Sequence, residues 1–347
     1  MSTSKKLSIR DIGKQLGVSV TTVSFILNGK AKEKRISESL TKKVLDFVEE
    51  VGFKPNSIAQ GLRTGKSKII CLMVEDISNV FFAQVARLIE EEAHNKGYRI
   101  LYCSTENKVE KTRELIKMFR DRLIDGYIIT PPEGVEEDIR LLMADNIPVI
   151  LADRFLPELP SSYVVIDNFK STHNAVQHML SQGFRHVAFV TLDSEQTQMA
   201  DRLRGYEHAM MEHGQPALIL KLNFDDSPAQ NIAQISSFLR ENKEIDSILF
   251  STNYIGIWGL QAIKSLNLRI PADVGVVSFD DHDLFKLHNP PITAIAQPVE
   301  EISKQIIRLM LDSLDGTGDG SKIQEIILTT KLIIRESSGT RQADGAD

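Results

Sequence analysis

Long apolar runs and cysteine are what this 347-residue sequence has least of. No stretch of about 18 consecutive apolar residues occurs, so no segment is predicted to span a membrane. The polar first residues are not followed by the apolar segment of a secretion signal, so we expect a cytoplasmic protein. The two cysteines, Cys71 and Cys103, each lie in an apolar run typical of a strand. Such positions favour buried thiols over a disulfide or a metal site.

The motifs of common enzyme classes are also missing from the sequence. It contains no Gly-x-Ser-x-Gly elbow, no Gly-x-Gly-x-x-Gly loop after a strand, and no His, Cys and acidic residues at metal-ligand spacing. The sequence therefore predicts neither a cofactor nor a bound metal.

The net charge of −6 is spread unevenly along the chain. Residues 1–68 hold 14 Lys or Arg and 6 Asp or Glu, a net charge of +8, so the remainder carries −14. A basic segment attached to an acidic body favours binding of a polyanion at that end alone. A basic face that is merely solvated is the alternative.

Residues 8–28 contain two short segments in which apolar residues recur at helical spacing. The pattern breaks at Gly17, where a backbone turn fits. Ser8 with Asp11 predicts a capping box at the start of the first helix, and Ser19 is placed to cap the second. Two helices joined by a tight turn are typical of the helix-turn-helix, whose second helix lies in the DNA major groove. A third helix is predicted from about Ser37 to Gly52.

From residue 69 onward, strand-like and helical segments alternate. The strand candidates are 69–74, 99–103, 126–130, 149–152, 163–166, 186–191, 247–251 and 274–279. The helical runs include 82–95, 172–181, 204–212 and 255–266. This alternation predicts parallel sheets with helices on both faces. Because about 270 residues is a lot for one such sheet, we expect two lobes with a cleft between them.

Several segments match the lactose-repressor (LacI/GalR) family at consistent spacing. They are residues 12–19, 21–24, 27–29, 52–56 and 59–65, followed by 180–189, 202–206, 271–281 and 293–298. The sequence resembles this family along nearly its whole length. The resemblance implies an α/β protein: a three-helix helix-turn-helix domain, then a two-lobed core like that of periplasmic binding proteins, built on two Rossmann-like parallel sheets.

The resemblance also implies domain limits. We expect a DNA-binding domain over residues 1–55, a hinge helix or linker over 56–68, and an effector-binding and dimerisation core over 69–340. Within the core, the N-lobe would comprise about 69–166 and 298–328, and the C-lobe about 167–297 and 329–340. Crossovers between the lobes are expected near 166–169, 296–298 and 328–330.

The same resemblance identifies candidate DNA contacts. Early positions of the recognition helix would touch base edges, because Thr hydroxyls bond several bases and Val or Thr methyls contact the thymine methyl. Basic and polar residues around them would hold phosphates. The full set of candidates is Ser8, Ser19, Val20, Thr21, Thr22, Ser24, Phe25, Asn28, Lys34, Ala59 and Leu62.

Two of these candidates have a structural alternative. Family members often carry Arg where this chain has Phe25, which leaves the operator sequence open, and Phe25 could instead pack on the third helix. Leu62 matches the hinge leucine that enters the minor groove and kinks the DNA in the family. Covering the core is the alternative for Leu62.

Candidate effector contacts follow the predicted strands, whose carboxyl ends meet at one edge of a sheet. Sugar sites combine aromatic faces with groups that hydrogen-bond hydroxyls. The candidates are Asn79, Phe81, Phe82, Asp153, Arg154, Arg202, Asn253, Asp280 and Gln297. Four have a structural alternative: Phe82 could belong to the core, Asp153 could cap a turn, and Asn253 or Asp280 could bond loop backbone. Trp258, the only tryptophan, could lie in the core or in the cleft.

The leading hypothesis is a sequence-specific transcription regulator, a repressor that binds operator DNA as a homodimer. A small effector in the cleft, a sugar or a sugar derivative, would control that binding by changing lobe closure. A sugar-modifying enzyme with an accessory DNA-binding domain is the alternative, and a secreted sugar carrier is disfavoured because it needs a signal peptide and no DNA reader.

Overall fold

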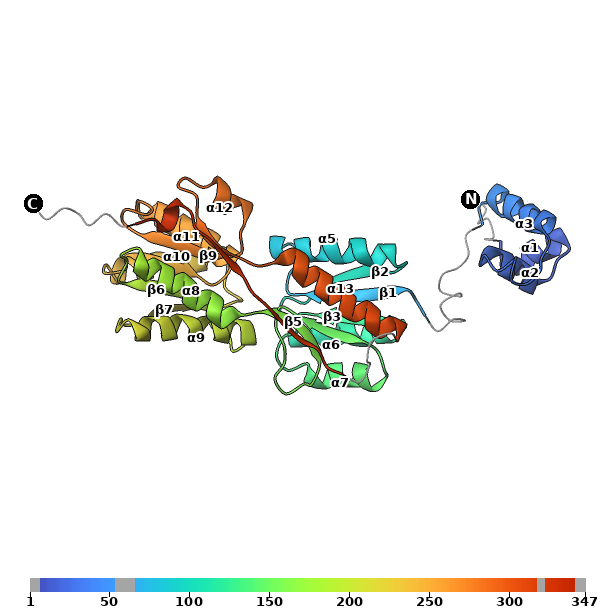
Figure 1. Cartoon of the computed structure of the whole chain (residues 1–347), viewed down its shortest axis with the longest axis horizontal. Coiled ribbons are helices and arrows are strands. Elements are labelled where there is room, and N and C mark those ends of the chain that lie inside the picture. The colour runs from blue at the N-terminus through green and yellow to red at the C-terminus, as the bar shows by residue number, and fades with distance from the viewer. Residues whose placement is uncertain (1–6, 54–65, 317–321, 341–347) are drawn as a thin grey trace, which may run out of the picture. The chain divides into compact units, whose positions relative to one another are not determined.

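The computed structural model of the chain describes residues 7–53, 66–316 and 322–340. The chain divides into two compact units, Met1–Ser67 and Lys68–Asp347 (Figure 1). Within the described ranges, no helix combines the length and the apolar character needed to cross a membrane.

The described part of the first unit, residues 7–53, contains three helices. They are α1 (Ile9–Leu16), α2 (Val20–Leu27) and α3 (Glu38–Glu50). Their small core is formed by the buried side chains of Ile12, Val23, Ile26 and Val44. These residues come from all three helices, so each helix buries one apolar face and exposes the other.

The turn between α1 and α2 has the predicted geometry. The Ser8 side chain and the Asp11 carboxylate form a capping box at the start of α1, and Ser19 caps α2 by accepting from the Thr22 N–H. Gly17 ends α1 with a φ of 67°, a left-handed conformation that glycine adopts without steric cost. The predicted helix-turn-helix is therefore confirmed.

The N-lobe of the second unit is a sandwich of one sheet between two helix layers. Its strands are β1 (Ile69–Val74), β2 (Arg99–Ser104), β3 (Gly126–Ile129), β4 (Val149–Ala152), β5 (Ser162–Ile166) and β11 (Glu325–Leu328), in the order β11-β5-β4-β3-β1-β2. Its helices are α5 (Val80–Asn95), α6 (Val109–Arg120), α7 (Glu136–Ala144) and α13 (Val299–Asp315). All pairings in this sheet are parallel. Alternate β1 residues pack with α5 and α13 on one face (Ile70, Leu72) and with α6 and α7 on the other (Cys71, Met73).

The C-lobe repeats this architecture with one antiparallel edge strand. Its strands are β6 (Val187–Leu192), β7 (Leu218–Leu222), β8 (Ser247–Phe250), β9 (Gly275–Phe279), β10 (Thr293–Ala296) and β12 (Lys331–Ile333), in the order β12-β10-β9-β8-β6-β7. Its helices are α8 (Asn168–Ser181), α9 (Thr197–Glu212), α10 (Pro228–Glu241), α11 (Asn253–Ser265) and α12 (Asp283–Leu287), with a 3-10 turn at Glu336–Ser338. Among these described strands, only β12 pairs antiparallel, against β10. The predicted α/β class with two parallel-rich sheets is confirmed.

The chain passes three times between the lobes. It leaves the N-lobe after β5 at Ile166 and enters α8 at Asn168, returns from β10 at Ala296 to α13 at Val299, and crosses again between β11 and β12. Figure 1 shows the three connections between the two sheets. Because all three strands end at the lobe boundary, the loops that follow them surround one cleft.

Candidate functional site

The exposed face of α2 carries the predicted base-reading residues. Val20 and Thr21 are exposed at the start of the helix, whereas Val23 faces the core. Thr22 is half-buried, and its hydroxyl lies 2.8 Å from that of Ser19. The structure thus presents two side chains of the first turn to solvent and holds a third by a hydrogen bond within the cap.

Phe25 lies outside the apolar core of this domain. It is half-buried, and the Lys34 ammonium lies 5.5 Å from its ring centroid. Lys34 also pairs with Glu33 at 3.0 Å. Asn28 closes α2, and its side-chain amide donates to the Ser24 carbonyl at 2.6 Å.

Four predicted DNA contacts remain: two lie on described helices or their caps, and two lie outside the described residues. Ser8 caps α1 and is exposed, and Ser24 is half-buried on α2. Ala59 and Leu62 lie outside the described residues, so their assignments stay predictions.

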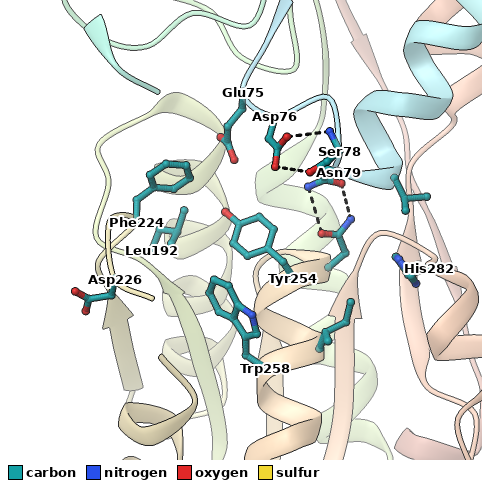
Figure 2. Close-up of a pocket in the computed structure, with 13 residues that line it drawn as sticks. Glu75, Asp76, Ser78, Asn79, Leu192, Phe224, Asp226, Tyr254, Trp258 and His282 are labelled. Carbon is teal, nitrogen blue, oxygen red and sulfur yellow. Dashed lines mark hydrogen bonds between the residues drawn. The ribbon is translucent and has the colours of Figure 1, made fainter. Parts of the chain in front are cut away.

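The cleft between the lobes contains a cavity of about 390 Å³. It is lined by Glu75, Asp76, Ser78, Asn79 and Val80 of the N-lobe, and by Leu192, Phe224, Asp226, Asn253, Tyr254, Ile257, Trp258 and His282 of the C-lobe. Figure 2 shows the three aromatic rings opposite the polar loop that follows β1. The Tyr254 and Trp258 rings lie one helical turn apart on α11, with centroids 5.2 Å apart. Trp258 therefore lines the cleft.

Two asparagines join the lobes across this cavity. The Asn253 amide donates to the Asn79 side-chain oxygen at 2.9 Å, and the Asn79 amide lies 3.4 Å from the Asn253 oxygen. Asn79 also caps α5 by accepting from the Phe81 N–H at 3.0 Å. Because each amide both donates and accepts, the pair can exchange its mutual bonds for bonds to a hydroxylated ligand.

A second cavity of about 210 Å³ adjoins the first and shares Val80, Asn253 and His282 with it. Besides the shared Asn253, three predicted effector residues line this second cavity: Phe81, Asp280 and Gln297. The Gln297 amide donates to the Asp280 carboxylate at 2.7 Å. Burial raises the pKa of Asp280, an effect that the Arg202 charge opposes.

Asp153 occupies the matching position in the N-lobe, directly after β4. Like Asp280, it has a positive φ, 70° against 63°, which Asp tolerates better than most residues. Burial raises the pKa of Asp153 to about 6, although the charges of Arg154 and Arg202 act in the opposite direction. The charges of Glu75 and Asp280 also act to raise the pKa of Asp153.

Arg154 forms a polar bridge between the lobes. Its side chain is almost fully buried and bonds Glu75 at 3.4 Å, Asn107 at 2.5 Å and, in the C-lobe, the Gln196 side-chain oxygen. The neighbouring Phe155 N–H donates to Thr197 Oγ1 at 3.3 Å. Arg154 is thus occupied by protein partners instead of lining either cavity.

Arg202 lies beneath the cleft within the C-lobe. Its Nε donates to Asn168 Oδ1 at 2.8 Å, and another guanidinium nitrogen donates to the Ser251 carbonyl at 2.6 Å. The guanidinium carbon stands 3.9 Å from the centroid of the Phe279 ring. Burial lowers its pKa, and the nearby Asp280 charge raises it.

The structure differs from sequence reasoning at several site residues. Phe82 packs in the apolar core beside Phe81 and lines neither of the two cavities. Conversely, sequence reasoning missed the cavity residues Glu75, Asp76, Phe224, Asp226 and His282. Glu75 and Asp76 directly follow β1, so the rule that sites lie at strand ends could have found them. Phe224 follows β7, a strand that was not predicted.

Comparison with known proteins agrees with this architecture. Residues 8–56 match the model of bacterial regulatory proteins of the lacI family, and residues 176–338 match that of the periplasmic binding protein-like domain. The transcriptional regulator KdgR of Bacillus subtilis is 32% identical over 333 residues, which are 95% of this chain and 97% of that protein. The chain belongs to the lacI family of bacterial regulatory proteins. It is a DNA-binding transcriptional regulator, as the sequence predicted, and not an enzyme.

Solved structures give the same result for the fold. A lacI-family regulator from Alkaliphilus metalliredigens, complexed with D-xylulofuranose, is 25% identical with a TM-score of 0.70, covering 78% of this chain and 98% of its own. The lac repressor dimer bound to operator and an anti-inducer is 20% identical with a TM-score of 0.83, covering 96% and 100%. The latter likeness concerns the fold alone.

Proposed function

We propose that this regulator binds its operator as a homodimer and that an uncharged or cationic carbohydrate in the interlobe cleft controls this binding. The observation that carries the proposal is the wall formed by Phe224, Tyr254 and Trp258 opposite the Asn79–Asn253 pair. Aromatic faces stack on the C–H side of a sugar ring, while amides bond its hydroxyls. The D-xylulofuranose complex of the Alkaliphilus regulator supports the same ligand class.

The charge of the cavity lining supports the restriction to uncharged or cationic sugars. Glu75, Asp76 and Asp226 line it, whereas none of its described lining residues is Lys or Arg. The nearby Arg154 is already bonded to Glu75. A sugar carboxylate or phosphate would therefore meet acidic groups without a free cationic partner.

The DNA-binding part of the proposal rests on α2. Val20, Thr21 and Phe25 would face base edges, and Lys34 would hold a phosphate near Phe25. A homodimer presents two such helices to two half-sites related by two-fold symmetry. The comparison structure of the lac repressor is likewise a dimer on operator. Leu62 keeps the minor-groove role that the family resemblance implies.

The effector class can be tested with Trp258, the only tryptophan in the sequence, as the reporter. Neutral hexoses and pentoses, a hexosamine and a uronate are titrated while the Trp258 fluorescence is recorded. We expect saturable binding of a neutral or amino sugar and at least tenfold weaker binding of the corresponding uronate. Preferred binding of the uronate would contradict the proposal.

A matched pair of variants separates the cavity from its surroundings. Asp226→Asn should narrow the discrimination against uronates, because it removes one carboxylate from the lining. Asp225→Asn, at the adjacent exposed position, should leave it unchanged.

Operator binding is tested separately. Bound sequences are selected from random duplex DNA, with and without the sugar that binds best, and the selected DNA is expected to be palindromic. Failure to enrich any sequence under all conditions would contradict the proposed operator readout without affecting the sugar result.

A further inference from the structure

A cluster of two imidazoles and one carboxylate lies on the C-lobe outside the cleft cavities. His173 extends from α8, and His208 and Glu212 extend from adjacent turns of α9. One ligand atom from each residue lies within 4.8 Å of the other two. His173 Nε2 stands 2.7 Å from Glu212 Oε2, and His208 Nδ1 stands 3.4 Å from Glu212 Oε1.

The packing of α8 against α9 holds these side chains in place. The helices, which lie side by side in Figure 1, approach so closely that a Cβ on Gly205 would stand 2.3 Å from the Phe169 carbonyl oxygen. The Phe169 ring stacks on His173 at a centroid distance of 6.1 Å and meets His208 edge-on at 5.6 Å. One aromatic ring thus supports both imidazoles.

The carboxylate is oriented by a further side chain. The Gln177 amide donates to Glu212 Oε2 at 2.9 Å. A hydrogen bond from outside the set of ligands is what orients metal-binding carboxylates in known sites. Such a partner reduces the conformational entropy that the carboxylate loses when it binds an ion.

The donor spacing suits a tetrahedral ion. Two donor atoms each about 2.1 Å from a tetrahedral zinc ion stand ~3.4 Å apart. His208 and Glu212 already have this separation, at 3.4 Å. His173 Nε2 stands 2.7 Å from the other carboxylate oxygen, Oε2, so a rotation of the Glu212 carboxylate must bring one oxygen to ~3.4 Å from both imidazole nitrogens. The side chains are 21% (His173), 45% (His208) and 40% (Glu212) exposed, so water can complete the coordination.

We propose that His173, His208 and Glu212 form a binding site for a divalent transition-metal ion such as Zn²⁺, which clamps α8 to α9. Imidazole and carboxylate donors suit zinc, nickel, cobalt and copper better than calcium or magnesium. The same two helices carry Asn168 and Arg202, which are hydrogen-bonded beneath the cleft. The bound ion therefore fixes the relative position of two helices that support the effector site.

The test uses the full-length protein without a histidine tag, titrated with zinc chloride against a colorimetric chelator. We expect one ion per chain with micromolar or tighter affinity. His208→Ala and Glu212→Gln should each weaken binding at least tenfold, and both sites are exposed enough for the fold to tolerate the change. His213→Ala is the matched control, because His213 is the exposed neighbour of Glu212 and its ring bonds the Ala209 carbonyl.

A thermal measurement gives a second readout. Zinc should raise the melting temperature of the wild type and of His213→Ala, but not of His208→Ala. The proposal is overturned if zinc does not bind saturably below 100 times the protein concentration. It is also overturned if His208→Ala binds zinc as the wild type does, or if His213→Ala loses as much affinity as His208→Ala.

Discussion

Replacing Asp153 with asparagine should stabilise the core at neutral pH. The substitution should also remove part of the pH dependence of the free energy of unfolding. Asp153 follows β4 with a φ of 70°, and burial raises its pKa from 3.8 to about 6. Asn has nearly the same shape and tolerates the left-handed backbone at least as well, so Asp153→Asn changes the charge without adding strain. The carboxylate is costly because its desolvation outweighs the attraction of Arg154 and Arg202.

The sign and size of the effect follow from proton linkage. Because the folded pKa of Asp153 lies above the unfolded one, the folded protein binds the proton more tightly, and stability falls as the pH rises from about 4 through about 6. At roughly 1.4 kcal/mol per tenfold change in a proton-binding constant, the full cost is about 3 kcal/mol. Since the side chain retains some solvent access, we expect Asp153→Asn to raise the free energy of unfolding by about 1–3 kcal/mol at pH 7.5.

The assay is urea unfolding followed by circular dichroism and Trp258 fluorescence between pH 4 and 7.5. Low protein concentration is needed because the isoelectric point is about 5.8. The advantage of Asp153→Asn should shrink towards zero near pH 4, where the wild-type carboxyl is protonated. Titration of Asp280 occurs in both proteins and largely cancels in the difference. The exposed Asp225→Asn control should show no such trend, and a gain equal at pH 4.5 and pH 7.5, or a loss at pH 7.5, refutes the reasoning.

Three further predictions concern helix packing, lobe closure and DNA readout. Gly205→Ala should lower the free energy of unfolding by about 1–3 kcal/mol in urea titrations, because its Cβ would clash with the Phe169 carbonyl oxygen. Gln196→Ala should remove the C-lobe partner of Arg154, and small-angle scattering should then show a more open core without ligand. Phe25→Arg should shift selected operators towards guanine at one position per half-site, by about 1–3 kcal/mol of discrimination.

Neighbouring positions provide the controls for these predictions. Gly339→Ala should cost little, because its Cβ would meet the Glu336 carbonyl at 3.4 Å. Glu195→Ala, next to Gln196 but exposed, should leave the scattering profile unchanged. Equal destabilisation by both glycine substitutions, or opening by Glu195→Ala, would contradict the proposed contacts. An unchanged base preference in Phe25→Arg would mean that α2 does not place this residue at a base edge.

Most interior strands were predictable from sequence, whereas three of the four edge strands were not. The apolar runs 69–74 and 149–152 coincide with β1 and β4, because strands covered on both faces must be apolar throughout. The edge strands β7, β11 and β12 were missed, because they are short and partly exposed and are therefore not apolar throughout. The interior strand β10, of four residues, was also missed, whereas the edge strand β2 was predicted. The thiols behaved nearly as predicted: both are free, with Cys71 buried and Cys103 half-buried.

The residues of the candidate site could be predicted from the sequence only where they lie next to the ends of predicted strands. Asn79, Asn253, Asp280 and Gln297 do line cleft cavities, since each follows or begins an element at the lobe boundary. Which of them meet could not be predicted, because the Asn79–Asn253 pair joins residues 174 positions apart. That contact depends on how far the lobes close. Phe82 was predicted as a site residue but packs in the core, because an aromatic residue beside a site can be buried with the apolar side chains.

Under the proposed function, an effector would act on the polar contacts that cross the cleft. The Asn79–Asn253 pair and the bonds of Arg154 to Gln196 join the lobes. Each net hydrogen bond contributes about 1 kcal/mol, and a bond to a charged group about 1.5–3 kcal/mol. These contacts therefore stabilise the lobe arrangement of this structure by only a few kcal/mol. A ligand whose affinities for two forms of a protein differ by about 5.5 kcal/mol moves an equilibrium from 1:99 to 99:1. A sugar that replaced the Asn79–Asn253 bonds with bonds to its own hydroxyls, and that also contacted Trp258, would be expected to shift a free-energy difference of that size.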